Sequence, residues 1–347
     1  MNSLKLLDKL FETQSLTFEE YKFLVENYNS ENAEYASKLA LIKRKEIYGN
    51  SVFIRGLIEI SNICKNDCYY CGIRCSNKNV SRFRLTKEDI LACCEKGFEL
   101  GFRTFVMQGG EDPFFTTDLM CDIVSSIKEK YPTCAVTLSL GELSKESYQR
   151  LFDAGADRYL LRHETADPCH YSRLHPDNLT LENRMNCLEN LRDIGYQVGC
   201  GFMVGSPYQT AEHIAKDLEF IENFKPDMCG IGPFIPHKDT PFRDFPAGSA
   251  DLTCYLLSIV RLIHPSVLLP ATTALGTVEG NGREKGILAG ANVVMPNLSP
   301  ESTRAKYELY NNKLSTGAES ANGLEALRKN MNAIGFEIVE SRGDVIK

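Results

Sequence analysis

No stretch of about 18 consecutive apolar residues occurs in the 347-residue chain, so no segment is expected to form a membrane-spanning helix. Basic residues are also not in excess, because 39 Lys and Arg stand against 46 Asp and Glu and leave a net charge of −7. Such a balance argues against a general nucleic-acid-binding protein. The first residues lack the apolar core of a signal peptide and the composition of a transit peptide. We therefore expect a cytoplasmic protein that binds neither membranes nor nucleic acids.

No linker or low-complexity stretch divides the chain either. Residues 1–50 show the apolar spacing of helices, and from residue 51 short β-branched runs alternate with amphipathic helical patterns. The eight expected strands are residues 52–60, 104–107, 135–140, 158–161, 198–204, 228–232, 267–270 and 292–295. Strands that alternate with helices form parallel sheets, and eight such units predict an α/β fold of the closed (β/α)8 barrel type. The expected organisation is a helical extension (1–50), the barrel (51–310) and a tail that packs on the barrel (311–347).

Four of the 13 cysteines lie close together, as Cys64, Cys68, Cys71 and Cys75. The others are scattered and are expected to fill the core. The group directly follows the first expected strand, where a parallel barrel carries its active site. A structural zinc site would normally use a second cysteine pair further on, and none follows, although Cys75 as a fourth ligand remains an alternative. The other possibility is a [4Fe–4S] cluster with three thiolate ligands and one open iron.

The spacing C-x3-C-x2-C, with Tyr70 before the last cysteine, resembles the motif of the radical S-adenosylmethionine (SAM) superfamily. The resemblance implies that the amino and carboxylate groups of SAM bind the fourth iron, which has no protein ligand. It also implies that an electron from the cluster splits SAM into methionine and a 5′-deoxyadenosyl radical. The protein would orient the two cofactors and exclude water.

Other parts of a SAM site follow later strands. Residues 108–111 (Gln-Gly-Gly-Glu) resemble the family's Gly-Gly-Glu element, although Gly-Gly before an acid is also a common turn. Arg162 and Glu164 alternate at the end of the fourth strand, so both are expected to point into the barrel mouth as catalytic residues; the alternative is a surface ion pair. The residues expected to bind SAM are Tyr70, Gln108, Gly109, Gly110, Glu111, Ser139, Glu164, Arg184 and Met203.

Longer phrases narrow the resemblance. They are Ile54-Arg55, RYLLRHETA (158–166), GIGPFIPHKDTPF (230–242), LPATTALGT (269–277) and NVVMPN (292–297). Together, over residues 45–310, they resemble HydE, the family of radical SAM [FeFe]-hydrogenase maturases. The resemblance implies a role in assembling the diiron subsite of the H-cluster. It also implies a small organometallic or cysteine-derived substrate, the companion maturases HydG and HydF, and an electron donor.

The same resemblance implies an inner cavity for an anionic substrate. Its expected residues are Arg55, Thr137, Arg162, Thr272, Thr273 and Ala274, with Tyr307 closing the mouth. For the threonines, polar caps at strand ends remain the alternative. No cysteine follows Cys254, so the tail offers no ligands for a second cluster and we expect one cluster only.

The alternatives within the superfamily are biotin synthase and methylornithine synthase. Cys134 and Cys200 could hold the second cluster of a biotin synthase. However, side chains alternate between the two faces of a strand. If Thr137 and Ser139 point into the barrel, Cys134 points toward the helices. If Gly201 and Met203 face the barrel interior, Cys200 likewise faces the helices. A zinc-binding interaction protein is the alternative outside the superfamily.

Overall fold

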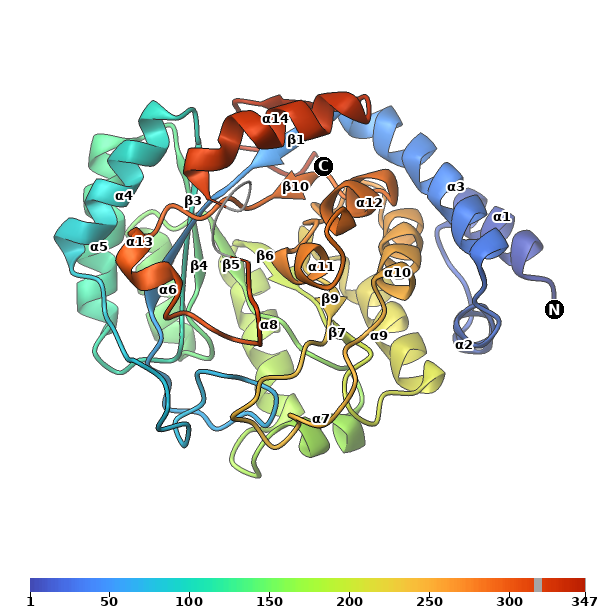
Figure 1. Ribbon diagram of the computed structural model, residues 1–347, viewed down its shortest axis with the longest axis horizontal. Coiled ribbons are helices and arrows are strands. Elements are labelled where there is room, and N and C mark those ends of the chain that lie inside the picture. Colours follow the sequence, from blue (N-terminus) through green and yellow to red (C-terminus); the bar gives the residue numbers. More distant parts are fainter. Residues whose placement is uncertain (315–319, 347) are drawn as a thin grey trace.

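The computed structural model describes residues 1–314 and 320–346, and it begins with three helices. They are α1 (Ser3–Thr13), α2 (Phe18–Glu26) and α3 (Ser30–Tyr48). The side chains of Asn2, Thr17 and Asn29 accept the first free backbone N–H groups, which fixes where each helix starts. In Figure 1 these helices flank the barrel at the right, with α3 packed along α10 and α2 along α9.

A ring of parallel strands follows. Its members are β1 (Ser51–Ile54), β2 (Gly56–Ser61), β3 (Thr104–Gly109), β4 (Ala135–Ser139), β5 (Arg158–Leu160), β6 (Gln197–Cys200), β8 (Met228–Cys229) and β10 (Val293–Val294). Six pair in the order β2-β3-β4-β5-β6-β8, and β10 pairs with β1. Residues 267–270 lie between β8 and β10, with parallel bridges from Leu268 to Met228 and from Pro270 to Val293. The ring is therefore closed, which confirms the predicted barrel.

Four expected strands differ from the prediction, since the first is divided at Arg55 into β1 and β2, and the sixth is divided after β8. The seventh, residues 267–270, forms bridges but no strand of its own, because Pro270 has no N–H to continue the ladder. The fifth breaks at Gly201, where φ is +148° and a Cβ would lie 2.0 Å from the carbonyl oxygen of Gly230. Beyond this close approach a separate pair forms, β7 (Met203–Val204) with β9 (Gly232–Pro233). The barrel mouth opens at this point.

Helices surround the ring on the outside (Figure 1). The predicted crossover helices are present as α4 (Lys87–Glu99), α5 (Thr117–Lys130), α6 (Lys145–Asp153), α8 (Leu181–Ile194), α9 (Ala211–Phe224), α10 (Ala250–Ile263) and α12 (Gly282–Leu288). Three short helices were not expected: α7 (Pro168–Leu174), α11 (Thr273–Val278) and α13 (Glu301–Arg304). No helix among the described residues is long and apolar enough to cross a membrane.

The end of the chain lies against the N-terminal ends of the strands. After η2 (Ala321–Gly323) and α14 (Leu324–Ala333), β11 (Glu337–Val339) pairs in parallel with residues 51–53 of β1. The Thr104 hydroxyl donates to the carbonyl of Arg342 (2.8 Å), and Arg158 donates to the Asp344 carboxylate (2.5 Å). Gly343 lies against the Phe53 ring. Residues 337–346 therefore form the floor of the barrel, and the loops that carry chemistry lie at the other end.

Candidate active site

A cavity of about 360 Å³ lies at the C-terminal ends of the strands, with walls from the loops that follow them. Most of the predicted site residues line it. They are Cys64, Tyr70, Cys71, Gln108, Gly109, Gly110, Glu111, Ser139, Arg162, Glu164, Arg184, Met203, Thr272, Thr273, Ala274 and Tyr307. We call this cavity the chamber. Its size lies within the range of small-molecule and cofactor sites.

The cysteine loop, residues 62–82, is held by two arginines. Arg74 forms a bidentate ion pair with Asp67, with Nε at 2.7 Å from the carboxylate. The Arg82 guanidinium donates to four carbonyl oxygens of the same loop. Neither arginine was predicted to be a site residue, and the partners of Arg82 are all backbone carbonyls. The loop has no regular secondary structure, so these bonds fix where its cysteines lie.

The three motif thiols influence one another. Burial raises the pKa of Cys68, and the neighbouring Cys71 raises it further. Burial and then Cys64 raise the pKa of Cys71 to about 12. Three thiolates this close repel one another unless cationic metal lies between them, and iron–sulfur clusters are held by such thiolates. Among residues 1–314 and 320–346, no three His, Cys, Asp or Glu side chains converge on one ion. Three cysteine thiols on one loop are a donor set that fits an iron–sulfur cluster.

The end of β3 packs directly on the cysteine loop. A Cβ on Gly110 would lie 2.3 Å from the carbonyl oxygen of Ile63 and 2.8 Å from the Cβ of Cys64, so only glycine fits. The next residue, Glu111, forms an ion pair with Lys65 at 3.2 Å and accepts from the backbone N–H of Glu142. The predicted Gly-Gly-Glu element thus brings bare backbone and a carboxylate to the chamber wall beside the cysteines.

Tyr70 is anchored by His175, which was not among the predicted site residues. Nδ1 of His175 lies 3.0 Å from the carbonyl oxygen of Tyr171, so this nitrogen carries the proton and donates. Nε2 is then free to accept from the Tyr70 hydroxyl at 3.2 Å. The His175 ring also stacks on the Tyr171 ring, 3.9 Å between centroids. Burial lowers the pKa of His175 to about 3, so the imidazole is neutral. His175 comes from the loop after α7, far from Tyr70 in the sequence.

Arg162 and Glu164 both point into the chamber, with 3.0 Å between Nη2 and Oε2. The pair does not have hydrogen-bond geometry. Nε and Nη2 of Arg162 and Oε2 of Glu164 are buried atoms without a hydrogen-bond partner. Unpaired buried polar atoms are costly, so these atoms fit a polar guest in the chamber. SAM, with an ammonium, a carboxylate and ribose hydroxyls, is such a guest.

Arg184 reaches the chamber from α8. Its Nε donates to Glu142 at 2.5 Å and its Nη1 donates to the carbonyl of Arg162 at 2.6 Å. Glu142 was not identified from the sequence, since nothing in its neighbourhood forms a motif. The two bonds direct one cation at the chamber wall, where it fits the carboxylate of SAM.

Residues 305–314, which we call the cover segment, close part of the mouth. The Gly72 N–H donates to the carbonyl of Leu309, and the Tyr307 ring faces the chamber with its hydroxyl 3.4 Å from the Gln108 amide. Lys313 forms a buried ion pair with Glu59 of β2 at 2.6 Å. Neither member of this pair was predicted, because strand and tail are about 250 residues apart.

Arg55, Thr137 and Cys68 are the predicted residues that do not line the chamber. Arg55 and Thr137 lie deeper in the barrel. Nη1 of Arg55 donates to the sulfur of Met228 at 2.8 Å, and Nη2 lies 3.5 Å from the carbonyl oxygen of Gly343 in the floor. Nε of Arg55 and the Thr137 hydroxyl have no hydrogen-bond partner. Burial, followed by the nearby Arg158 cation, lowers the pKa of Arg55. This lower layer is polar, positively charged and incompletely bonded.

The two threonines expected on a strand end belong to a helix. Thr272 is the N-cap of α11, its hydroxyl accepting from the N–H of Leu275, and Thr273 is the first helical residue. This helix was not predicted, because it is only six residues long. Both side chains still lie at the chamber, as does Ala274.

Cys134 and Cys200 are fully buried and line no part of the chamber. Cys200 lies beside Cys229 and near Asp217 of α9, on the helix side of the sheet. The orientation predicted from strand alternation thus holds for Cys200. The chamber offers no second set of cysteines for a biotin synthase-like cluster among the described residues.

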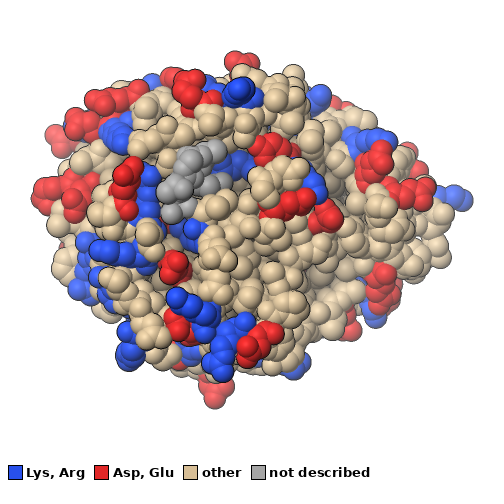
Figure 2. Space-filling model, in the orientation of Figure 1, with Lys and Arg blue, Asp and Glu red and all other residues tan. Residues whose placement is uncertain are grey.

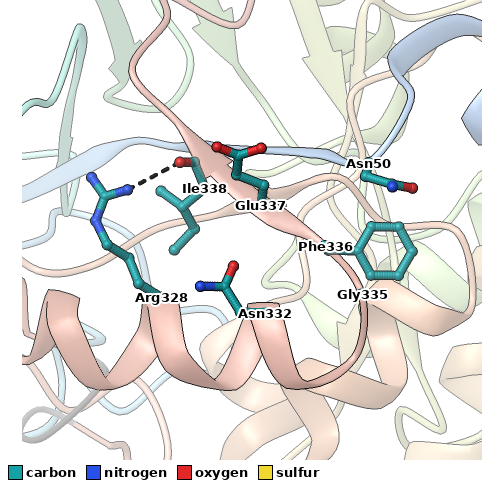
Figure 3. Close-up of a pocket in the computed structure, with 7 residues that line it drawn as sticks. All are labelled: Asn50, Arg328, Asn332, Gly335, Phe336, Glu337 and Ile338. Carbon is teal, nitrogen blue, oxygen red and sulfur yellow. Dashed lines mark hydrogen bonds between the residues drawn. The ribbon is translucent and has the colours of Figure 1, made fainter.

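A second hollow, of about 360 Å³, lies between α14 and β11 on the floor side. Figure 3 shows its polar lining, in which Arg328 bonds the carbonyl of Ile338 at 3.0 Å and Asn50, Asn332 and Glu337 surround the opening. It contains no cysteine, and none of the predicted site residues lies in it. The chamber is therefore the candidate active site.

Comparison with known proteins agrees with this geometry. Residues 58–221 match the radical SAM superfamily, and fold and site together define a radical SAM enzyme. The [FeFe] hydrogenase maturase subunit HydE of Thermotoga maritima is 44% identical over 314 residues, which cover 90% of this chain and 89% of that protein. The chain belongs to the HydE family.

More distant relatives include the alternatives considered above. The 3-methylornithine synthase of Methanosarcina acetivorans is 26% identical over 332 residues, 95% of this chain and 92% of that protein. The crystal structure of methylornithine synthase (PylB) superposes with a TM-score of 0.84 at 26% identity, covering 96% of this chain and 97% of that one. The barrel is therefore shared, and the higher identity to HydE separates the families.

Proposed function

We propose that this protein is a radical SAM maturase that acts in the assembly of the diiron subsite of [FeFe]-hydrogenase. The observation that carries the proposal is the 44% identity to the T. maritima maturase along 90% of the chain. The chamber supports it, because the thiols of Cys64 and Cys71 line it together with buried polar atoms of Arg162 and Glu164 that have no hydrogen-bond partner. Methylornithine synthase has the same barrel but only 26% identity to this chain.

In this proposal Cys64, Cys68 and Cys71 hold one [4Fe–4S] cluster. When bound, the cluster supplies the electron that splits SAM into methionine and a 5′-deoxyadenosyl radical. The protein binds and orients SAM. Glu111 and the backbone at Gly110 meet its amino group, and Arg184 meets its carboxylate.

Arg162 and Glu164 are the proposed catalytic residues at the reacting end of SAM. Their unpaired atoms offer a donor and an acceptor without first breaking a hydrogen bond. Met203 and Tyr70 provide the surfaces for the adenine. The cover segment limits access of water, since Tyr307, Leu309 and Lys313 all line the chamber.

The proposed substrate is a small organometallic or cysteine-derived molecule, and the lower layer is where its anionic part would lie. There, Nε of Arg55 and the Thr137 hydroxyl have no hydrogen-bond partner in the protein. Thr272, Thr273 and Ala274 would border the substrate from above. HydG and HydF are the proposed companion maturases. No cysteine follows Cys254, so we propose that the protein works with one cluster.

The cofactor part of the proposal is tested on anaerobically purified protein. We expect about four irons per chain and a reduced-cluster EPR signal that SAM alters. Cys71→Ser should lose the iron, whereas Cys254→Ser, at a cysteine distant from the chamber, should keep it. One zinc per chain without iron would refute this part.

The maturase role is tested in a host that uses [FeFe]-hydrogenase. A strain that lacks the gene should make inactive hydrogenase, the wild-type gene should restore activity, and Cys71→Ser should not. Normal hydrogenase activity in the deletion strain would contradict the role. If the protein were a biotin synthase, the deletion strain would not grow without added biotin. Growth of that strain without biotin would therefore exclude this alternative.

A further inference from the structure

A groove of about 470 Å³ lies on the outer surface beside the cysteine loop. Residues 76–79 of that loop form one wall, and residues 238–243, which follow β9, form the other. Lys78, Lys238 and Arg243 are all exposed at this groove. We call it the basic groove. Figure 2 shows Lys and Arg gathered at the lower left of this face, where the two loops run in Figure 1.

The positive charge of the basic groove is poorly compensated. Within the part of the chain that the structure describes, Lys78 and Lys238 form no ion pair, and Lys78 donates only to the carbonyl of Cys75 at 3.2 Å. Arg243 has one exposed partner, Asp244, at 3.5 Å. Asp239 is a carboxylate in the lining, where it accepts from the Asn79 amide at 2.8 Å, so three basic side chains face one acidic side chain among the lining residues. The nearby Lys65, by contrast, is paired with Glu111. In a chain of net charge −7, this is a local field that attracts anionic groups.

The groove lies one hydrogen bond away from the chain segment that carries the motif cysteines. The Asn77 amide, whose residue lines the groove, donates to the carbonyl oxygen of Gly72 at 2.7 Å. Gly72 directly follows Cys71 and is packed against the His237 ring. A short path of covalent bonds and one hydrogen bond therefore joins the groove to the Cys71 sulfur. Electron tunnelling favours such connected paths over gaps.

We propose that the basic groove docks a small acidic one-electron carrier protein, which reduces the cluster through Asn77, Gly72 and Cys71. This inference rests on the proposed function, since it presupposes a cluster on Cys71. The carrier, a reduced iron–sulfur protein, is oxidised by one electron and the cluster is reduced by one electron. Complexes of this kind bury little surface and depend on charge for their rate of association.

The complementary charge also explains how such a partner finds the right face. Two acidic proteins repel each other over most orientations, and the local excess of positive charge at the groove lowers the barrier there. Charges at the rim of an interface act mainly on the association rate and on its dependence on salt. The groove would thus select the orientation in which the carrier faces the cysteine loop.

The test compares wild-type protein with the variant Lys78→Gln/Lys238→Gln/Arg243→Gln. The control carries three substitutions on helices at other faces, Lys5→Gln/Lys38→Gln/Lys329→Gln, which remove the same charge. The probe is an acidic low-potential ferredoxin. Its complex with each cluster-loaded protein is measured as a dissociation constant against salt, and cluster reduction is followed by stopped-flow absorbance, with dithionite as a second reductant.

For the groove variant we expect reduction by ferredoxin to slow by about tenfold or more at low salt, with weaker binding and a flatter salt dependence. Dithionite should reduce all three proteins at the same rate, and the control should behave like wild type. If the groove variant binds ferredoxin and accepts its electron like the control, the docking site is wrong while the maturase proposal stands. A wild-type protein that holds no cluster would instead overturn the proposed function, and the docking proposal with it.

Discussion

His175 is expected to determine how tightly the protein binds SAM, although it does not line the chamber. It holds the hydroxyl of Tyr70, which lines the chamber one residue before Cys71. Burial raises the pKa of that hydroxyl well above its usual value, so the hydroxyl stays protonated and needs an acceptor. His175→Ala removes the acceptor and the ring that packs against Tyr70 and Tyr171.

The size of the effect follows from the lost hydrogen bond. A buried polar group left without a partner costs about 1–3 kcal/mol. If Tyr70 contacts SAM, bound SAM must then be held by a ring that is free to turn, and the dissociation constant should rise about 5- to 150-fold. His175→Gln is the matched control, because its amide can donate to the carbonyl of Tyr171 and accept from Tyr70. It should recover most of the affinity.

The assay is a SAM titration of the reduced-cluster EPR signal, with thermal unfolding measured in parallel. Because burial lowers the pKa of His175 to about 3, the histidine stays neutral and its contribution should not change between pH 6 and 8. In a Tyr70→Phe background, His175→Ala should have a much smaller effect, since the two changes remove the same bond. If His175→Ala lowers the melting temperature but leaves SAM affinity unchanged, the histidine is structural only and our reasoning fails.

Three further predictions concern other parts of the barrel. Arg55→Ala, below the chamber, should leave SAM affinity near wild type but lower hydrogenase maturation by about tenfold or more. A loss of this size is typical of a hydrogen bond to a charged group. If the variant binds SAM poorly, the assignment of Arg55 to the substrate layer is wrong. Although burial raises the pKa of Asp344, Arg342 and Arg158 lower it below its usual range, so its stabilisation is present at neutral pH and lost as the pH falls below about 4. Asp344→Asn should flatten that acid dependence in urea unfolding followed by circular dichroism. Cys75→Ser should keep full iron content by metal analysis, because Cys75 is exposed outside the chamber.

The barrel could be predicted because each of its units is a local pattern. Alternation of β-branched runs with amphipathic helices depends on neighbours within about ten residues, and the ring follows from counting them. The one unit that failed to form a strand contains Pro270, whose missing N–H weakens the ladder. The floor made by residues 337–346 could not be foreseen in the same way. Its strand has three residues, and only the exposed backbone edge of β1 determines where it pairs.

The same distinction separates the site residues that the sequence revealed from those it hid. Cys64, Cys68 and Cys71 form a contiguous motif, so their spacing alone predicts a shared ligand. Glu142 and His175 act on residues more than 40 positions away, and no spacing connects them to Arg184 and Tyr70. Strand alternation predicted that Thr137 and Ser139 face the same side. It could not predict how deep in the barrel each side chain lies. Ser139 lines the chamber and Thr137 lies below it, and this difference depends on how far the floor extends into the barrel.

Glu164 shows why such hidden partners matter for function. Its backbone has φ of +66°, a left-handed conformation that is strained for a residue with a side chain and typical of functional sites. Its N–H donates to the carbonyl of Gly201, and two residues on, the N–H of Ala166 donates to the buried Asp217 carboxylate at 2.6 Å.

His163 closes this arrangement behind the strand. Its Nδ1 accepts from the Gly201 N–H, so Nε2 carries the proton and donates to Asp217 at 3.2 Å. Burial lowers the pKa of His163 to about 3 and raises the pKa of Asp217. The pair is therefore a support that holds a strained turn in place. The carboxylate of Glu164 reaches the chamber because of two side chains that themselves never touch it.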